Sequence, residues 1–150
     1  MRRKIDALML DSHEANIPLP ISKVDLITLL SASKIAYSTP SETRLLVRSA
    51  VFSPGFEFML AFGFNNDTLL NIVMSPMAAL SGKAALERYK SIQAALEVHF
   101  GRPRNWLRRL ASRLAPYDQC ADWRLENATI EHRLLDRFGI EDTVTISFKI

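Results

Sequence analysis

The stretch FEFMLAFGFNNDTLLNIVM, residues 56–74, decides the fold class of this chain. Both halves are rich in aromatic and branched aliphatic residues, and the polar triplet Asn-Asn-Asp separates them. This pattern predicts two β-strands joined by a short turn. If residues 65–67 form the loop, Phe64 faces Thr68 and one face of the hairpin carries large apolar side chains only. We expect that face to form the core, with these six residues: Phe58, Leu60, Phe62, Leu70, Ile72 and Met74.

The opposite face of the same hairpin is too apolar for an ordinary solvated sheet surface. It carries Met59, Leu69 and Val73 in this register. Two interpretations remain open. Either residues 1–20 or the loop at 116–127 cover this face, or it is a protein-binding patch, because large exposed apolar patches usually mark contacts. In the second case Met59, Leu69 and Val73 contact the partner.

The elements around this hairpin follow from periodicity and punctuation. A strand over residues 42–52 completes a three-strand meander, and helices are expected over 22–34 and 82–100. Ser22 and Ser81 are placed to cap these helices, and Gly101 is placed to end the second one. Residues 1–20, which end in NIPLP, are expected to run partly extended.

The C-terminal region predicts a closing hairpin with strands at 128–136 and 143–150. The last strand alternates apolar and polar residues, as a sheet with one buried face requires. Its expected inward residues are Val144, Ile146, Phe148 and Ile150. This strand is also a candidate sheet edge, through which two copies of the chain would pair into a homodimer.

These elements predict one globular domain over residues 1–150. The fold class is α+β, with two layers and an antiparallel sheet of about five strands. Three of the strands come from the meander and two from the C-terminal hairpin, and the helices pack on one face.

The charge of the chain is concentrated in one segment. The net charge is +3, yet GRPRNWLRRLASRLAPY, residues 101–117, holds five arginines and no acidic residue. Residues 105–115 predict a short amphipathic helix with leucines on one side and arginines on the other. The candidate partner-binding residues of this segment are Arg104, Trp106, Arg108, Arg109 and Arg113.

Three interpretations of the arginine segment compete. Its guanidinium groups form the solvated face of a helix, or they meet an acidic protein surface, since arginine and tryptophan are enriched at binding hot spots. Alternatively, residues 102–113 bind nucleic acid, with arginines on phosphates and Trp106 stacked on a base. A membrane-bound helix would need a larger apolar face, so we expect no membrane contact.

Nothing in the sequence predicts catalysis. The three histidines fall in three different elements, and the five glycines form no phosphate-binding motif. The single cysteine, Cys120, lies between Asp118 and Asp122, whose carboxylates would raise the pKa of its thiol. We therefore expect no catalytic residue, no cofactor and no metal site. An unpaired cysteine and the lack of a signal-peptide pattern favour a cytoplasmic location.

The order helix, three strands, helix, two strands is similar to that of the class I type III secretion chaperones and of several small bacterial immunity and adaptor proteins. The resemblance implies non-catalytic binding of another protein. The chain departs from the chaperone pattern because it is basic and lacks the final helix. The sequence thus predicts a small bacterial-type protein-binding module that recognises an acidic or apolar protein surface. The alternative is nucleic-acid binding through residues 102–113.

Overall fold

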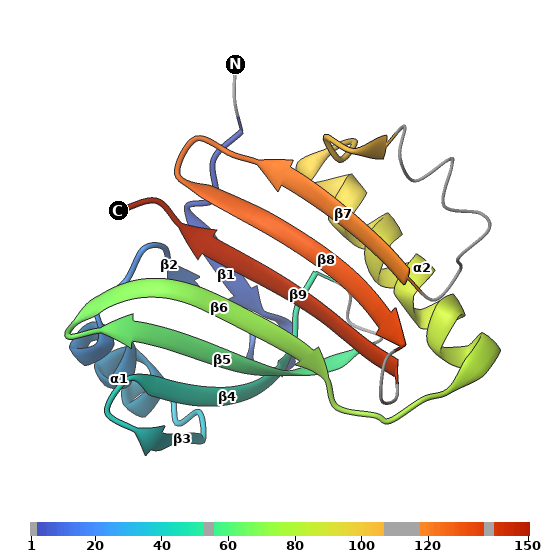
Figure 1. Ribbon diagram of the computed structural model, residues 1–150. Coiled ribbons are helices and arrows are strands. Elements are labelled where there is room, and N and C mark those ends of the chain that lie inside the picture. The colour runs from blue at the N-terminus through green and yellow to red at the C-terminus, as the bar shows by residue number, and fades with distance from the viewer. Residues whose placement is uncertain (1–2, 53–55, 107–117, 137–139) are drawn as a thin grey trace.

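A seven-stranded antiparallel sheet dominates the molecule (Figure 1). The computed structural model describes residues 3–52, 56–106, 118–136 and 140–150. The strand order across the sheet is β3-β4-β5-β6-β9-β8-β7. The strands are β3 (Tyr37–Ser41), β4 (Arg44–Ala50), β5 (Glu57–Asn65), β6 (Thr68–Pro76), β7 (Asp118–Arg124), β8 (Ala128–Asp136) and β9 (Ile140–Phe148).

The remaining elements are a two-stranded sheet and two helices. Strands β1 (Ala7–Leu10) and β2 (Ala15–Pro18) flank the 3-10 turn η1 (Asp11–His13), and the helices are α1 (Lys23–Ala32) and α2 (Gly82–Phe100). The prediction of about five strands with helices packed on one face is therefore wrong. Two of the missed strands, β3 and β7, are rich in polar residues, and the layer against the sheet contains a β-hairpin as well as helices.

The β5–β6 hairpin forms as predicted, but its register differs at the turn. Asn65 pairs with Thr68 and Phe64 with Leu69, so the turn has two residues, and Asn66 takes a positive φ of 53°. Gly63 then pairs with Asn71, which leaves Leu70 in a β-bulge. Leu69 is 2% exposed on the core side, whereas Leu70 is half-buried. The other five predicted core residues of the hairpin are buried: Phe58, Leu60, Phe62, Ile72 and Met74.

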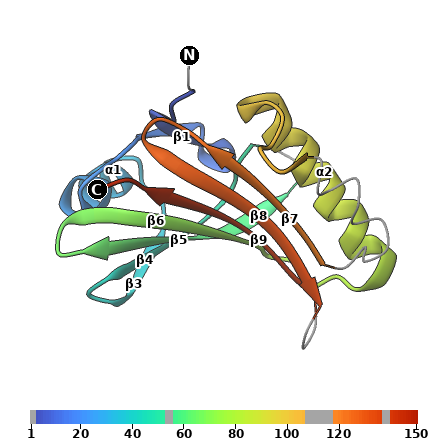
Figure 2. The ribbon, with the colours of Figure 1, turned by 45° about the horizontal axis from the view of Figure 1, so that its top comes forward.

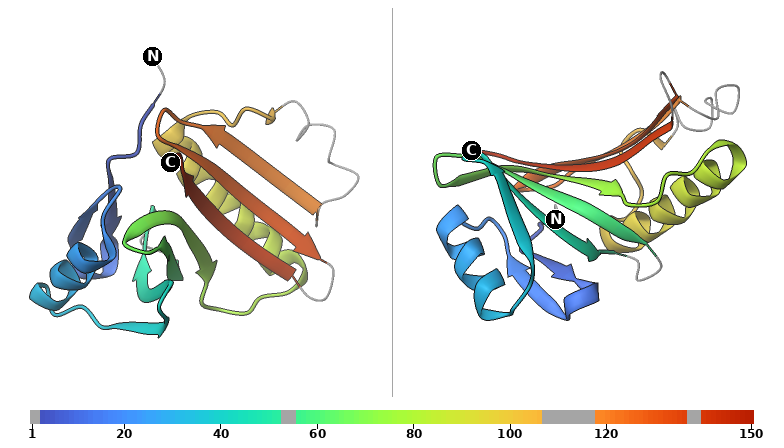
Figure 3. Two further views of the ribbon diagram at one scale, coloured as in Figure 1. Left: turned by 60° about the vertical axis from the view of Figure 1, so that its left-hand side comes forward. Right: turned by 90° about the horizontal axis from the view of Figure 1, so that it is seen from below.

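The core lies between one face of the large sheet and the elements beneath it. Figure 3 shows α1, the β1–β2 hairpin and α2 on the same side of the sheet. The N-terminal residues 1–20 contribute Leu8, Leu10 and Ile17 to this core, where each is at most 1% exposed. The segment expected to run partly extended is thus a hairpin that covers the core face.

The helix ends follow local chemistry. The Ser22 hydroxyl accepts a hydrogen bond from the Asp25 backbone N–H at 3.0 Å, which confirms the predicted N-cap of α1. Ser81 precedes α2 but makes no side-chain capping bond. Gly101 ends α2 with a positive φ of 78°, a conformation that favours glycine.

The C-terminal strand lies inside the sheet, not at its edge. β9 pairs with β6 on one side and β8 on the other, so it cannot pair two copies of the chain. The sheet edges are β3, which contains Pro40, and β7. Val144 and Ile146 face the core as predicted, while Phe148 is only partly buried and Ile150 is 96% exposed beyond the strand.

The elements that cover the curved sheet form two groups: α1 and the β1–β2 hairpin lie at one end, and α2 lies at the other (Figure 2). The α1 helix begins beside the β5–β6 turn, where Asp67 accepts hydrogen bonds from the backbone of Lys23 and Val24. The α2 helix lies against β8 and β9 (Figure 3), where Tyr89 stacks on His132 and Arg88 faces Asp142. No helix in the described part of the chain is long and apolar enough to cross a membrane.

Candidate functional site

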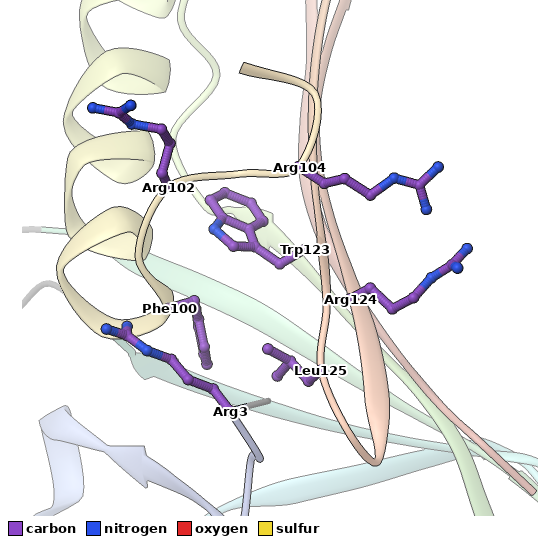
Figure 4. Close-up of a pocket in the computed structure, with 7 residues that line it drawn as sticks. All are labelled: Arg3, Phe100, Arg102, Arg104, Trp123, Arg124 and Leu125. Atoms are coloured by element: carbon purple, nitrogen blue, oxygen red, sulfur yellow. The ribbon is translucent and has the colours of Figure 1, made fainter. Parts of the chain in front are cut away.

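A pocket of about 430 Å³ opens where the end of α2, strand β7 and the N-terminal segment meet. Four exposed arginines surround it, and they come from three separate parts of the chain (Figure 4). Arg3 precedes β1, Arg102 and Arg104 follow α2, and Arg124 ends β7. We call this site the arginine pocket, and its lining is Arg3, Phe100, Arg102, Arg104, Trp123, Arg124 and Leu125.

The floor of the arginine pocket is apolar and fixed in place. Trp123 and Leu125 are each 3% exposed, and Phe100 packs against the same hydrophobic core. The Trp123 indole N–H donates to the Gly101 carbonyl at 2.7 Å. This bond joins β7 to the end of α2, so the two elements that carry the arginines are held together.

Arg3 is anchored to the same helix end. Its Nη1 donates to the His99 carbonyl at 2.9 Å, and its own carbonyl accepts from the Glu126 backbone N–H at 2.9 Å. A cation is favourable there because the last carbonyls of a helix carry partial negative charge. A Cβ at Gly101 would lie 3.3 Å from Arg3 Nη1, so glycine leaves room for this contact.

The loop after α2 is held along the edge of β7. The Arg104 backbone N–H donates to the Asp122 carbonyl at 2.7 Å, and the Asn105 side chain donates to the Cys120 carbonyl at 2.8 Å. The guanidinium carbon of Arg102 lies 4.7 Å from the centre of the Trp106 ring, a cation–π contact. The backbone of this segment is therefore positioned by β7 itself, and the edge strand is partly covered.

The four guanidinium groups do not converge on one point. Figure 4 shows Arg104 and Arg124 running side by side away from the pocket, while Arg3 and Arg102 lie on the side of α2. The arginines thus form a rim around the apolar floor. Among the described residues, none of the four makes an ion pair with an acidic side chain.

Asp6, the acidic residue closest in sequence to Arg3, forms an ion pair with Lys4. Asp6 Oδ1 lies 3.0 Å from Lys4 Nζ. The hydrogen bond and charge of Asp6 raise the pKa of Lys4, with a smaller contribution from Glu126. Asp6 therefore pairs with Lys4 and with none of the four arginines of the rim.

The structure places two of the predicted arginine-segment residues in this region. Arg104 lines the pocket, and Trp106 is 39% exposed beside Arg102. The other three predicted contacts, Arg108, Arg109 and Arg113, lie outside the described residues. Sequence reasoning missed Arg3 and Arg124, because neither belongs to the arginine segment. The alternation of buried Trp123 and Leu125 with exposed Arg124 is the signal that could have placed Arg124 on a strand.

The predicted apolar patch is not assembled as expected. The bulge at Leu70 shifts the register of β6, so Leu69 faces the core instead of the opposite face. Leu69 is therefore not available to contact a partner. Met59 and Val73 do lie on the opposite face, where both are half-buried. Val73 pairs there with Thr145, and Met59 pairs with Ser75 and Arg48. Polar neighbours therefore interrupt this face.

In the described residues of the two segments expected to cover that face, neither does so. Residues 7–18 pack on the core side, and residues 118–124 form β7 within the sheet. Figure 3 shows no helix or strand on the second face in the described part of the chain.

A second cluster of polar side chains is buried beneath α2. His132 faces inward and is 0% exposed, with its ring stacked on Tyr89 at 4.0 Å between centroids. Nδ1 lies 2.8 Å from Gln93 Oε1, and Nε2 lies 3.0 Å from Asp142 Oδ1. Both ring nitrogens therefore lie within hydrogen-bonding distance of a side-chain oxygen, which fixes the orientation of the ring. A histidine–carboxylate pair can act as a general base, but no substrate can reach a ring that is wholly covered.

Asp142 also faces Arg88 from α2. Arg88 Nε lies 3.7 Å from Asp142 Oδ2, and neither atom has a hydrogen-bond partner. Asp142 therefore contacts both His132 and the Arg88 guanidinium within the buried cluster. This arrangement connects α2 to both β8 and β9.

Cys120 lies on the second face of β7, partly exposed. Burial raises the pKa of its thiol most, followed by the charge of Glu131, while Arg133 opposes the rise. Asp122 contributes least, so the direction expected from the sequence is correct but its main cause is different.

The described residues contain no group of three or more histidine, cysteine or acidic side chains that could hold a metal ion. The sequence matches no protein-family model, and no curated protein or solved structure matches it either.

Proposed function

We propose that the protein is a non-catalytic binding module that holds an acidic segment of a partner protein at the arginine pocket. The observation that carries this proposal is a rim of four exposed arginines, without acidic partners in the described chain, around an apolar floor. Uncompensated surface cations attract anionic partners and steer their approach.

The divergence of the guanidinium groups favours an extended partner. A single small anion needs donors that converge on it, as in a bidentate carboxylate or phosphate contact. Arg104 and Arg124 project together, whereas Arg3 and Arg102 lie on the other side of the floor. A chain with several carboxylates spaced along it can meet both pairs at once.

The apolar floor favours protein over nucleic acid. Binding of single strands uses exposed aromatic faces on which bases stack. Trp123 is 3% exposed and its indole N–H is already bonded, so its faces are not open to a base. Trp106 is more exposed, but Arg102 covers part of its ring. The floor residue that stays half-buried is Phe100, and an aliphatic side chain between acidic residues can pack against it.

Nucleic-acid binding through the arginine segment is the alternative. It shares the same cations and the same dependence on salt, since phosphate contacts release counterions. The two proposals differ in which ligand binds more tightly when both are present: an acidic peptide in the first, an oligonucleotide in the second. A cytoplasmic location for this binding is our expectation, because the single cysteine is free.

The experiment measures binding of a labelled peptide of alternating glutamate and leucine by fluorescence anisotropy. Its glutamine counterpart and a short single-stranded oligonucleotide compete with it. We expect the acidic peptide to bind, the glutamine peptide to bind at least about tenfold more weakly, and Arg124→Glu to weaken the acidic peptide further. Arg44→Glu is the matched control, because Arg44 is exposed on β4 at the opposite side of the sheet. Equal binding of both peptides, or stronger binding of the oligonucleotide, would overturn the proposal.

A further inference from the structure

A second pocket, of about 540 Å³, lies where β5 begins, β6 ends and the chain leads into α2. It is separate from the arginine pocket and shares no lining residue with it. Its walls are mostly apolar, and two of them, Met77 and Leu80, are 40% and 39% exposed. We call it the Arg88 pocket, and its lining is Arg48, Phe56, Glu57, Pro76, Met77, Ala78, Leu80 and Arg88.

The polar groups of this pocket differ in how they are partnered. At the rim, Arg48 and Glu57 form an ion pair with 2.5 Å between Nη2 and Oε2, so their charges offset each other. Arg88 is only 8% exposed, and its Nη1 donates to the Ala78 carbonyl. Its Nε has no hydrogen-bond partner. The pocket thus holds one buried, incompletely bonded cation among apolar walls.

The contact between Arg88 and its carboxylate is also loose. Asp142 Oδ2 lies 3.7 Å from Arg88 Nε, and the other oxygen of the same carboxylate bonds His132. The shared carboxylate thus leaves Arg88 Nε without a hydrogen bond. An incompletely bonded buried donor group is costly, and a carboxylate that accepts hydrogen bonds from the guanidinium would relieve that cost.

We propose that the Arg88 pocket binds a small amphipathic carboxylic acid. The carboxylate accepts hydrogen bonds from the Arg88 guanidinium, and the aliphatic chain lies against Phe56, Met77 and Leu80. A buried guanidinium gives charge-assisted hydrogen bonds, which are stronger than neutral ones, and the exposed apolar walls gain by being covered. Ligand pockets with apolar walls and few polar groups commonly bind such molecules.

The probe is octanoate, titrated into the full chain and followed by amide chemical shifts in two-dimensional NMR. Octanol is the comparison ligand, because it keeps the chain and lacks the charge. We expect octanoate to shift amides at residues 77–80 and 88, and to bind about tenfold more tightly than octanol. Equal affinities, no binding, or shifts located elsewhere would overturn the proposal.

A variant at the pocket rim avoids disturbing the buried Arg88. Leu80→Asp places a negative charge next to the entering acid, and Leu80→Asn is its neutral match. We expect Leu80→Asp to weaken octanoate at least about tenfold relative to Leu80→Asn, with little difference for octanol. If both variants bind octanoate equally, the charge of the ligand does not enter this pocket. Arg124→Glu leaves octanoate binding unchanged, so this test is independent of the acidic-peptide proposal.

Discussion

Nε2 of His132 lies 3.0 Å from Oδ1 of Asp142, inside the interface between α2 and the sheet. The other carboxylate oxygen faces Arg88, so removal of this anion leaves the buried Arg88 guanidinium without its carboxylate. We expect Asp142→Asn to lower the free energy of unfolding by about 3–5 kcal/mol. Chemical denaturation measures this change. The control is Glu141→Gln, which removes an exposed neighbour; a loss below about 1 kcal/mol for Asp142→Asn would contradict the buried network.

The β-bulge in β6 predicts different costs for two adjacent leucines. Leu69 is 2% exposed, so Leu69→Ala removes core packing and should cost about 2–4 kcal/mol. Leu70 is half-buried in the bulge, and Leu70→Ala should cost about 1 kcal/mol or less. Thermal or chemical unfolding of the two variants decides between the registers. The register expected from the sequence, with Leu70 in the core, predicts the reverse order.

The two helix-capping serines also predict a difference. Ser22 accepts a bond from the Asp25 N–H, so Ser22→Ala should lower the free energy of unfolding by about 1 kcal/mol. Ser81 makes no such bond, and Ser81→Ala should leave stability unchanged within about 0.5 kcal/mol. Denaturant titration of both variants measures these values. Equal losses would mean that Ser81 caps α2 after all.

The Cys120 thiol should react slowly with alkylating reagents at neutral pH, because the thiolate is the reactive form and the pKa is raised. Glu131→Gln removes one cause of the rise, so its pKa should fall and the alkylation rate should increase. Arg133→Gln should have the opposite effect. The rate measured against pH gives the pKa in each variant. A slower rate in Glu131→Gln would show that Glu131 does not act on the thiol.

The raised thiol pKa also sets the direction of a stability change. The folded protein holds its proton to a higher pH than the unfolded chain does. The stabilisation from Cys120 is therefore fully present below the unfolded pKa and is lost as pH rises through the folded pKa. Cys120→Ser should remove this part of the alkaline loss of stability, as denaturation over an alkaline pH series would show.

Strong local patterns were predictable from the sequence, and long-range placement was not. The β5–β6 hairpin and α2 are confirmed because each has clear periodicity and end signals. The bulge at Leu70 was missed because two adjacent leucines leave the alternation ambiguous. The sequence pattern of β7 resembles a loop, because Asp118, Asp122 and Arg124 obscure the inward positions of Ala121 and Trp123.

In the candidate site, too, the local part was predictable from the sequence and the long-range part was not. The arginine segment was visible in the sequence as a cluster of charge. Arg3 and Arg124 join it only through the fold: Arg3 bonds to the end of α2, and Arg124 follows Trp123, which bonds to Gly101. No local pattern links residues separated by 121 positions, such as Arg3 and Arg124. Their proximity depends on which strand pairs with which.

The most direct test of the acidic-segment proposal is a charge exchange between protein and peptide. The double variant Arg104→Glu/Arg124→Glu reverses two adjacent cations of the rim and leaves Trp123 and Leu125 in place. Fluorescence anisotropy compares its binding of the glutamate–leucine peptide and of a lysine–leucine peptide with that of the unaltered chain. We predict that the variant loses affinity for the acidic peptide and gains affinity for the basic one. Unchanged binding of the acidic peptide would contradict the central claim.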